Sequence, residues 1–274
     1  MKILIDVGNT RLKLAKLVKG EFTFITALDT QNPASLAAEL KVHVLRITAT
    51  KLADEPKTPE VTTALAVSVH HPETEAAIAA ALSGIPIEWV HPSASAAGVT
   101  NAYPNPKQLG ADRWVGMIGL TRHFCPPHPS LILANFGTAT TVDTLGADRL
   151  FRGGLILPGV WMMQRALAQG TARLPETPGT LMDYPTQTTA AITTGIAAAQ
   201  AGALLRQVSV AQSLDKQDPM VCVSGGAWPL VAAEVRRALP NAVIHELPHV
   251  VLQGLAVLAV LASQGGGENI VMQK

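Results

Sequence analysis

The chain has 274 residues, 48% of them hydrophobic and 15% charged, so it can bury a sizeable core and does not have the composition of a disordered protein. The net charge is +1 and no block of five basic residues occurs, which argues against a nucleic-acid partner. The two cysteines lie far apart and outside any CxxC motif, so we expect neither a disulfide framework nor a zinc site.

No targeting or membrane segment is expected. Asp6 interrupts the first apolar run, which excludes the apolar core of a signal peptide. The apolar stretch 250–262 is too short to cross a bilayer and reads as a buried helix. We therefore expect a cytoplasmic protein with no membrane partner.

The chain opens with three predicted strands. Residues 2–7 form an apolar run, residues 11–18 alternate polar and apolar side chains, and residues 22–28 follow a Lys-Gly-Glu turn. Asp6 stands at the tip of the first strand, directly before a glycine turn. The opening is therefore a meander with a carboxylate beside a tight turn.

Helices and strands alternate in the next part of the chain. An initial proline, early acidic residues and a final glycine predict a helix over 72–84. We also expect a short helix at 33–40, strands at 43–48, 64–70 and 86–90, an irregular segment over 91–109, and a helix from near Ala111.

Residues 130–157 repeat the opening pattern of strand, turn, strand, turn and strand. An apolar strand ends at Asn135, a turn follows at Gly137 and Thr138, and the segment 3–9 aligns with 132–138 at an offset of 129 residues. The shared order indicates an internal duplication. Chance similarity between two glycine-turn hairpins is the alternative.

The second half continues the alternation of helices and strands. We expect helices at 159–169, 188–210, 229–238 and 249–263, a loop at 170–185, a strand running into a glycine turn over 220–228, and a strand at 242–247. Together these elements predict a mixed α/β fold with two closely packed domains, residues 1–115 and 116–274.

Two glycine turns of one kind suggest a clamp for phosphate. Such turns present unpaired backbone N–H groups, and one carboxylate beside the phosphates can hold a hydrated Mg²⁺. Asp6 has that position, and a hairpin from each half would bind one triphosphate. Nearby hydroxyls can add hydrogen bonds, from Thr10, Thr138, Thr140 and Thr141. The alternative is that the Asp-Val-Gly-Asn segment is only a turn.

Other nucleotide-binding signatures are absent from the sequence, since it contains neither GxxxxGK[ST] nor GxGxxG. A third glycine turn at 224–226 could let an adenine lie close to the backbone, or could simply join a strand to a helix. Asp143, in the middle of a predicted strand, has equally balanced structural and functional interpretations.

Phosphoryl transfer needs a group that accepts or orients the proton of the attacking hydroxyl. Asp112 follows Gly110 at a predicted helix start, and Arg113 next to it could bind an acidic substrate. From the residues alone, the favoured interpretation of Asp112 is a helix N-terminal acid that is stabilised by the helix dipole.

Several motifs in order resemble the type III pantothenate kinase family, which includes proteins of the Bvg accessory factor type. The first phosphate motif is similar to DVGNT at 6–10, the substrate segment to YPNPKQLGADR at 103–113, and the second phosphate motif to NFGTATTVD at 135–143. GGLILPG at 153–159, TTAAITTG at 188–195 and SGG at 224–226 follow in the family's order, so the resemblance spans nearly the whole chain.

The resemblance implies two actin-like, ribonuclease H-like domains with duplicated βββ units and a nucleotide cleft between them. The implied reaction transfers the γ-phosphate of ATP to pantothenate, giving 4′-phosphopantothenate in the first step of coenzyme A synthesis. The implied assembly is a homodimer that needs Mg²⁺ and a monovalent cation, K⁺ or NH₄⁺.

The resemblance also implies roles for individual residues. Asp112 is the implied proton acceptor. ATP would be bound by Asp6, Val7, Gly8, Asn9, Thr10, Arg11, Leu12, Lys13 and Thr138. Pantothenate would be bound by Tyr103, Gly110, Ala111, Asp112, Arg113 and, at a dimer interface, Thr188.

One departure from the family pattern concerns the monovalent cation. The family commonly has Asp where this chain has Asn135, and an amide oxygen lacks the charge that favours a cation. Phe136 is also bulkier than is usual in the family. The expected cation site at Asn135 is therefore in doubt.

Two other functions fit the same residues. The chain could be another small-molecule kinase of the actin-like fold, such as a sugar or acetate-type kinase. It could also be a regulatory accessory protein that binds ATP without catalysis. Asp6, Asp112 and Thr138 favour catalysis.

Overall fold

A computed structural model describes residues 1–49, 60–264 and 272–273. The chain divides into two compact units, Met1–Cys125 with His249–Lys274, and Pro126–Pro248. We refer to them as unit 1 and unit 2 and describe each by itself.

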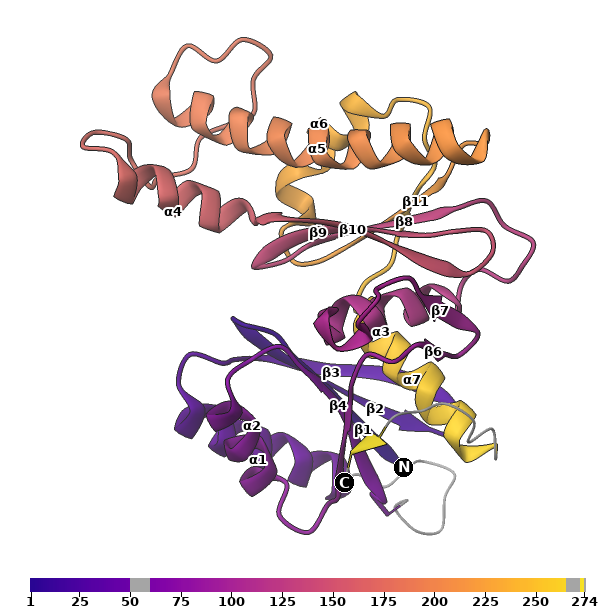
Figure 1. The fold of residues 1–274 in the computed structure, drawn as a ribbon. Helices are drawn as coiled ribbons and strands as arrows, with labels where there is room; N and C mark the ends of the chain where they lie inside the picture. The colour runs from indigo at the N-terminus through magenta and orange to yellow at the C-terminus, as the bar shows by residue number, and fades with distance from the viewer. Residues whose placement is uncertain (50–59, 265–271, 274) are drawn as a thin grey trace. The chain divides into compact units, whose positions relative to one another are not determined.

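Unit 1 contains a mixed sheet in the order β13-β5-β4-β1-β2-β3 (Figure 1). The long strands β1 and β2 are antiparallel and pair Asp6 with Lys13, while β1 and β4 are parallel. The strands are β1 (Lys2–Val7), β2 (Arg11–Val18), β3 (Glu21–Asp29), β4 (Thr63–Ser68), β5 (Ile87–Val90) and β13 (Met272–Gln273). The antiparallel hairpin of β6 (Ser95–Ala96) and β7 (Val99–Asn101) is not part of this sheet. The helices are α1 (Pro33–Ala49), α2 (Pro72–Ala81), α3 (Ala111–Leu120) and α7 (Val250–Ser263), with a 3-10 turn at Pro106–Gln108.

Two helix pairs pack against the unit 1 strands. Alternate residues of β1, including Ile3 and Ile5, share a core with the buried side chains of α1 and α2. α3 and α7 pack on each other and contact β1, β2 and β4. The helices approach closely at Gly254, where an added Cβ atom would lie 2.0 Å from the Val115 carbonyl oxygen.

The expected strand at 43–48 is wrong, because α1 continues to Ala49. Its buried side chains are Leu36, Leu40, Val44 and Ile47, which recur at the spacing of one helix face. Val44 and Ile47 are β-branched and, taken alone, favour a strand. Together with Leu36 and Leu40 they form the buried face of one helix.

Unit 2 contains strands in the order β12-β11-β8-β9-β10. Its core joins Ile132, Ala134, Val142 and Val223 to the apolar faces of three helices. The strands are β8 (Leu131–Phe136), β9 (Ala139–Leu145), β10 (Leu150–Pro158), β11 (Met220–Ser224) and β12 (Ile244–Glu246), and the helices are α4 (Val160–Gly170), α5 (Thr188–Asp215) and α6 (Trp228–Ala238). In Figure 1, α5 is the long helix that packs against α4 and α6.

The expected duplication is confirmed by the strand order. β1 pairs antiparallel with β2 and parallel with β4, and β8 pairs antiparallel with β9 and parallel with β11. In each unit the outer strands follow in the same sequence, β3 and β5 in one and β10 and β12 in the other. β1 and β8 begin at Lys2 and Leu131, which have the same offset as the sequence repeat.

The compact units differ from the expected domain limits in two ways. A boundary between residues 115 and 116 would cut α3, and unit 1 continues to Cys125. α7, although it lies near the end of the chain, belongs to unit 1 because it packs on α3.

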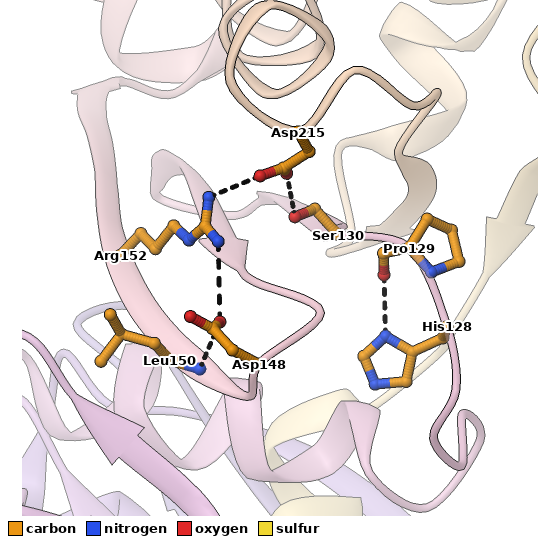
Figure 2. Close-up of polar contacts among 7 residues, drawn as sticks. All are labelled: His128, Pro129, Ser130, Asp148, Leu150, Arg152 and Asp215. Atoms are coloured by element: carbon orange, nitrogen blue, oxygen red, sulfur yellow. Dashed lines mark hydrogen bonds and ion pairs between the residues drawn. The ribbon is translucent and has the colours of Figure 1, made fainter.

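A network of hydrogen bonds and ion pairs links three segments of unit 2, namely the end of α5, the segment just before β8 and the β9–β10 hairpin (Figure 2). Asp215, at the end of α5, accepts hydrogen bonds from Ser130 Oγ and from Arg152 Nη1, the latter at 2.7 Å. Arg152 on β10 also lies 3.6 Å from Asp148 in the β9–β10 turn. The hydrogen bond from Ser130 is the main reason that the pKa of Asp215 is lowered, and the bond from Arg152 adds to it.

Within the described residues, α5 is long and apolar enough to span a membrane by length and composition. Helices in the core of soluble proteins meet the same criterion, and one face of α5 contributes to the unit 2 core.

Candidate active site

The first phosphate turn lies between β1 and β2 in unit 1. Val7 is buried at the end of β1, and Gly8 N donates to the Arg11 carbonyl at 3.1 Å, which closes a tight turn. Asn9 is exposed at its tip. Arg11, Leu12 and Lys13 then begin β2. The residues expected to bind ATP from 6 to 13 are therefore contiguous around one turn.

Asp6 is a buried carboxylate with one cationic partner. Its side chain is 5% exposed, and Lys13 Nζ lies 2.9 Å from its Oδ2 atom. The pairing follows from the register, which places Asp6 opposite Lys13 on neighbouring strands. Lys13 remains 32% exposed, so its ammonium group can also face a bound anion.

Thr30, which the sequence analysis missed, braces this turn. Its hydroxyl donates to the Asn9 carbonyl at 3.0 Å, and its backbone N–H donates to the Thr10 carbonyl at 3.1 Å. Thr30 is fully buried just beyond β3. No local sequence pattern marks Thr30 for this role, because its partner Asn9 lies 21 residues earlier in the chain.

His249 is a second residue that the sequence analysis missed. It has a left-handed backbone with φ of 58°, and its ring stacks on Phe24 of β3 at a centroid distance of 3.8 Å. Burial, and then the charge of Lys13, lower the pKa of His249, while Asp6 acts in the opposite direction. The start of α7 therefore lies in the electrostatic field of the Asp6–Lys13 pair.

The expected substrate segment ends at the start of α3, also in unit 1. Arg113 is buried, and its Nη1 donates to the Tyr103 hydroxyl at 3.2 Å. Asp112 lies in the first turn of α3 and is half-buried, and its Oδ1 accepts from the Arg113 backbone N–H at 2.8 Å. Gly110 precedes the buried Ala111, and an added Cβ atom at Gly110 would lie 2.9 Å from Asp112 Oδ1. The structure thus brings Tyr103 together with 110–113.

The second phosphate turn lies between β8 and β9 in unit 2 and is one residue shorter than the first, because β8 and β9 pair up to Phe136 and Thr140 whereas β1 and β2 pair up to Val7 and Leu12. Gly137 N donates to the Ala139 carbonyl at 3.1 Å, and an added Cβ atom would lie 3.3 Å from that oxygen, as at Gly8 and Arg11. Thr138 is exposed at the tip. Gly159 N donates to the Thr138 carbonyl at 3.1 Å, so the end of β10 supports this turn.

Asn135 occupies the position in β8 that Asp6 has in β1. It is half-buried and lies opposite Thr141 on β9 and Ser224 on β11. The bulky ring of Phe136 is fully buried and stacks on the ring of Trp228, with the two ring centroids 5.7 Å apart. Gly225 has a φ of +98°, and an added Cβ atom would lie 2.2 Å from the Phe136 carbonyl oxygen. The third glycine turn is therefore packed directly on the second phosphate motif.

Thr188 is exposed at the first position of α5 in unit 2. The preceding loop is held to the same helix by hydrogen bonds from Gly179 N to Thr193 Oγ1 and from Met182 N to Thr194 Oγ1. Tyr103 and 110–113 belong to unit 1, so the expected substrate residues come from both units.

The protein side chains near the two turns offer few metal ligands, so a divalent metal here would be held mainly by the phosphates of a nucleotide. Among residues 1–49, 60–264 and 272–273, no group of three His, Cys, Asp or Glu side chains could hold a metal ion. A single carboxylate such as Asp6 fits Mg²⁺, which keeps several waters and binds nucleotide phosphates. Asn135 offers one neutral oxygen for a monovalent cation.

Comparison with known proteins identifies the family. The sequence profile described as type III pantothenate kinase matches residues 2–210. The chain belongs to the type III pantothenate kinase family. A type III pantothenate kinase of Bordetella bronchiseptica is 44% identical over 272 residues, which cover 94% of this chain and 97% of that protein.

Solved structures confirm the fold of this type III pantothenate kinase family member. A conserved Baf family protein from Campylobacter jejuni has a TM-score of 0.52 at 14% identity, covering 96% of this chain and 99% of that one. The activator of 2-hydroxyisocaproyl-CoA dehydratase from Clostridium difficile, solved with ADPNP, has a TM-score of 0.50 at 14% identity, covering 98% of both. The expectation of an α/β fold with two actin-like domains is confirmed.

Proposed function

We propose that this chain is a kinase that transfers the γ-phosphate of ATP to the primary hydroxyl of pantothenate, giving 4′-phosphopantothenate for coenzyme A synthesis. The observation that carries this assignment is family membership along nearly the whole chain, with 44% identity to a curated relative. The tight turns at Gly8 and Gly137 support it, since each exposes a polar residue at its tip, Asn9 in one and Thr138 in the other.

Both turns are assigned to the phosphates of ATP. Asp6, Gly8 to Lys13 and Thr138 are the residues assigned to ATP, and Val7 and Leu12 support them from the core. When Mg²⁺ is bound, it neutralises charge on the phosphate oxygens, and Asp6 holds its water shell. Lys13 adds a positive charge beside Asp6.

Asp112 accepts the proton of the attacking hydroxyl as the phosphoryl group arrives. In a loose transition state that proton leaves late, so the orientation of the carboxylate matters more than its basicity. The hydrogen bond from Arg113 N to Asp112 Oδ1 fixes that orientation. Arg113, oriented by Tyr103, suits the carboxylate of pantothenate, since guanidinium and carboxylate match in shape and charge.

The monovalent cation is a separate part of the proposal. K⁺ or NH₄⁺ binds near Asn135, more weakly than it would bind beside a carboxylate. Turnover measured against K⁺ concentration should therefore saturate at a lower concentration in an Asn135→Asp variant. Identical K⁺ curves for the two proteins would show that Asn135 is not at the cation site.

The proposed assembly is a homodimer in the cytoplasm. Unit 2 has a groove of about 210 Å³ between α4, α5, α6 and the loop at 171–187, lined by apolar side chains that include Trp161, Leu181 and Leu230. These three side chains are 37–53% exposed. An apolar surface of this kind suits a second copy of the chain, with Thr188 close to the contact. Sedimentation of the purified protein as a monomer at micromolar concentration would contradict it.

A coupled assay of ADP release tests the function. ADP should appear with ATP and Mg²⁺ only when pantothenate is added, and mass spectrometry should detect 4′-phosphopantothenate. A panel of sugars and acetate serves as the control for other kinases of this fold. ADP release that is independent of pantothenate, or ATP binding without turnover, would contradict the proposal.

A further inference from the structure

Gln200 is a fully buried amide in the middle of α5. It is 0% exposed, and its neighbours on the same helix face, including Ala197 and Leu204, belong to the apolar core of unit 2. A polar side chain in such a core costs stability unless each of its polar atoms finds a partner.

The two ends of the Gln200 amide differ in how well they are paired. Nε2 donates to the Pro158 carbonyl at 2.9 Å and lies 3.2 Å from the sulfur atom of Met163. Oε1 has no hydrogen-bond partner among the described residues. Turning the amide over would place its oxygen against the Pro158 carbonyl, so the contact with Pro158 determines its orientation.

This pairing is poorly suited to stabilising the fold. A buried acceptor without a partner loses its hydration without compensation, so an apolar side chain of the same size would fit this core at least as well. What the amide provides is a directed hydrogen bond to the last residue of β10.

Pro158 is directly connected to the second phosphate turn. Gly159 N, the next residue, donates to the Thr138 carbonyl. An added Cβ atom at Gly159 would lie 2.3 Å from the Thr138 carbonyl oxygen and 2.5 Å from that of Gly137. The backbones are in such close contact that a shift of Pro158 and Gly159 displaces the turn.

We propose that Gln200 is a positioning residue for phosphoryl transfer, which holds the Gly137–Thr138 turn through Pro158 and Gly159. This inference rests on the proposed function, because it takes that turn to be the one that binds the nucleotide phosphates. Small displacements of such a turn affect nucleotide binding and turnover while the core stays packed.

The test replaces Gln200 by Met, an apolar side chain of similar length. Gln200→Met should keep or raise the melting temperature, while the KM for ATP and the dissociation constant of a fluorescent ATP analogue increase on the order of tenfold. The KM for pantothenate should change much less. A purely structural role would instead lower the melting temperature and leave the KM for ATP unchanged.

Gln207→Met is the matched control. Gln207 lies two turns later on the same helix, is also buried, and donates to Thr144 Oγ1 at 3.3 Å. Thr144 lies at the end of β9 that is farther from the phosphate turn, so ATP binding should not change. An equal rise in the KM for ATP in both variants would overturn the proposal.

The remaining outcomes separate this inference from the proposed function. If the wild type phosphorylates pantothenate and Gln200→Met binds and uses ATP normally, only the role of Gln200 is wrong. If the wild type neither binds the ATP analogue nor turns over, the proposed function fails and the inference fails with it. Should neither Gln200→Met nor Gln200→Leu fold, Gln200 is a stability residue and the proposal is overturned.

Discussion

Asp6 and Asn135 occupy equivalent positions in the two hairpins, and only Asp6 is charged. The difference matters because Asp6 has Lys13 at 2.9 Å. A carboxylate at 135 would not have a lysine opposite it, since the residue aligned with it on β9 is Thr141. The duplicated positions therefore differ in charge, and only the one in unit 1 forms an ion pair.

Asp112 lies in the first turn of a helix, where an acid could be present for stability alone. If it orients and accepts the hydroxyl proton, Asp112→Asn should lower kcat by a factor of roughly 100 or more while ATP still binds. Glu73→Gln is the matched control, because Glu73 is an acid in the first turn of α2 and is exposed. The measurements are kcat from steady-state kinetics and the dissociation constant of ATP for both variants. Near-normal turnover of Asp112→Asn would show that Asp112 is not the proton acceptor.

At the scale of elements, close helix contacts in unit 1 depend on small residues. An added Cβ atom at Gly254 on α7 would overlap the Val115 carbonyl oxygen of α3, whereas at Gly202 on α5 it would meet no atom within 4 Å. α3 and α7 pack this closely because neither Gly254 on α7 nor Gly119 on α3, whose added Cβ atom would lie 2.2 Å from the Val250 carbonyl oxygen, has a side chain.

Alanine substitutions at these two glycines should act in opposite directions. Gly254→Ala should lower the free energy of unfolding by roughly 1–3 kcal/mol, because α3 and α7 must separate. Gly202→Ala should raise it by up to about 1 kcal/mol through helix propensity. Urea denaturation of both variants measures the difference, and equal effects would contradict the close α3–α7 packing.

The Asp215 network joins the end of α5 to β10 and to Ser130, which directly precedes β8, and its contribution to stability should depend on pH. Asp215→Asn should cost about 1–2 kcal/mol at pH 7, since it removes the charge that Ser130 and Arg152 stabilise. The pKa of Asp215 is lowered from 3.8, so this contribution is present above 3.8 and is lost as pH falls through the lower folded value.

The measurement is the difference in unfolding free energy between wild type and Asp215→Asn at pH 7 and at decreasing pH. The difference should stay constant down to about pH 4 and narrow below it. A difference that widens as the pH falls would show that the charged form is not the one stabilised.

Across the whole chain, the duplication gives each unit one tight turn after its central strand. Each turn is closed by a hydrogen bond from a glycine N–H, to the residue three positions on at Gly8 and two positions on at Gly137. Under the proposed function, ATP binding uses both turns.

Single substitutions in the two units should therefore weaken the same binding event. Mg-ATP should raise the melting temperature of the wild type, and both Asp6→Asn in unit 1 and Thr138→Ala in unit 2 should reduce that rise. The melting temperatures without nucleotide serve as the control for folding. If either variant kept the full nucleotide-induced rise, its turn would not take part in binding the phosphates.

Local patterns in the sequence were enough to predict the features that arise between near neighbours in the chain. The alternation of residues 11–18, the strand tips at Asp6 and Asn135, and the repeat between them gave the duplicated hairpins correctly. The order of the motifs identified the family. These signals are visible because they act between neighbours in the chain or recur at a constant offset.

Only the tertiary structure decided which distant residues support the site. Thr30 donates to the first turn across the sheet, His249 stacks on β3, and Gln200 donates from α5 to the end of β10. No local pattern marks these contacts. The strand expected at 43–48 is the last part of α1, because packing against the unit 1 core selects the helical face. The physical reason is that such contacts arise when separate segments pack together, while propensity and spacing describe each segment alone.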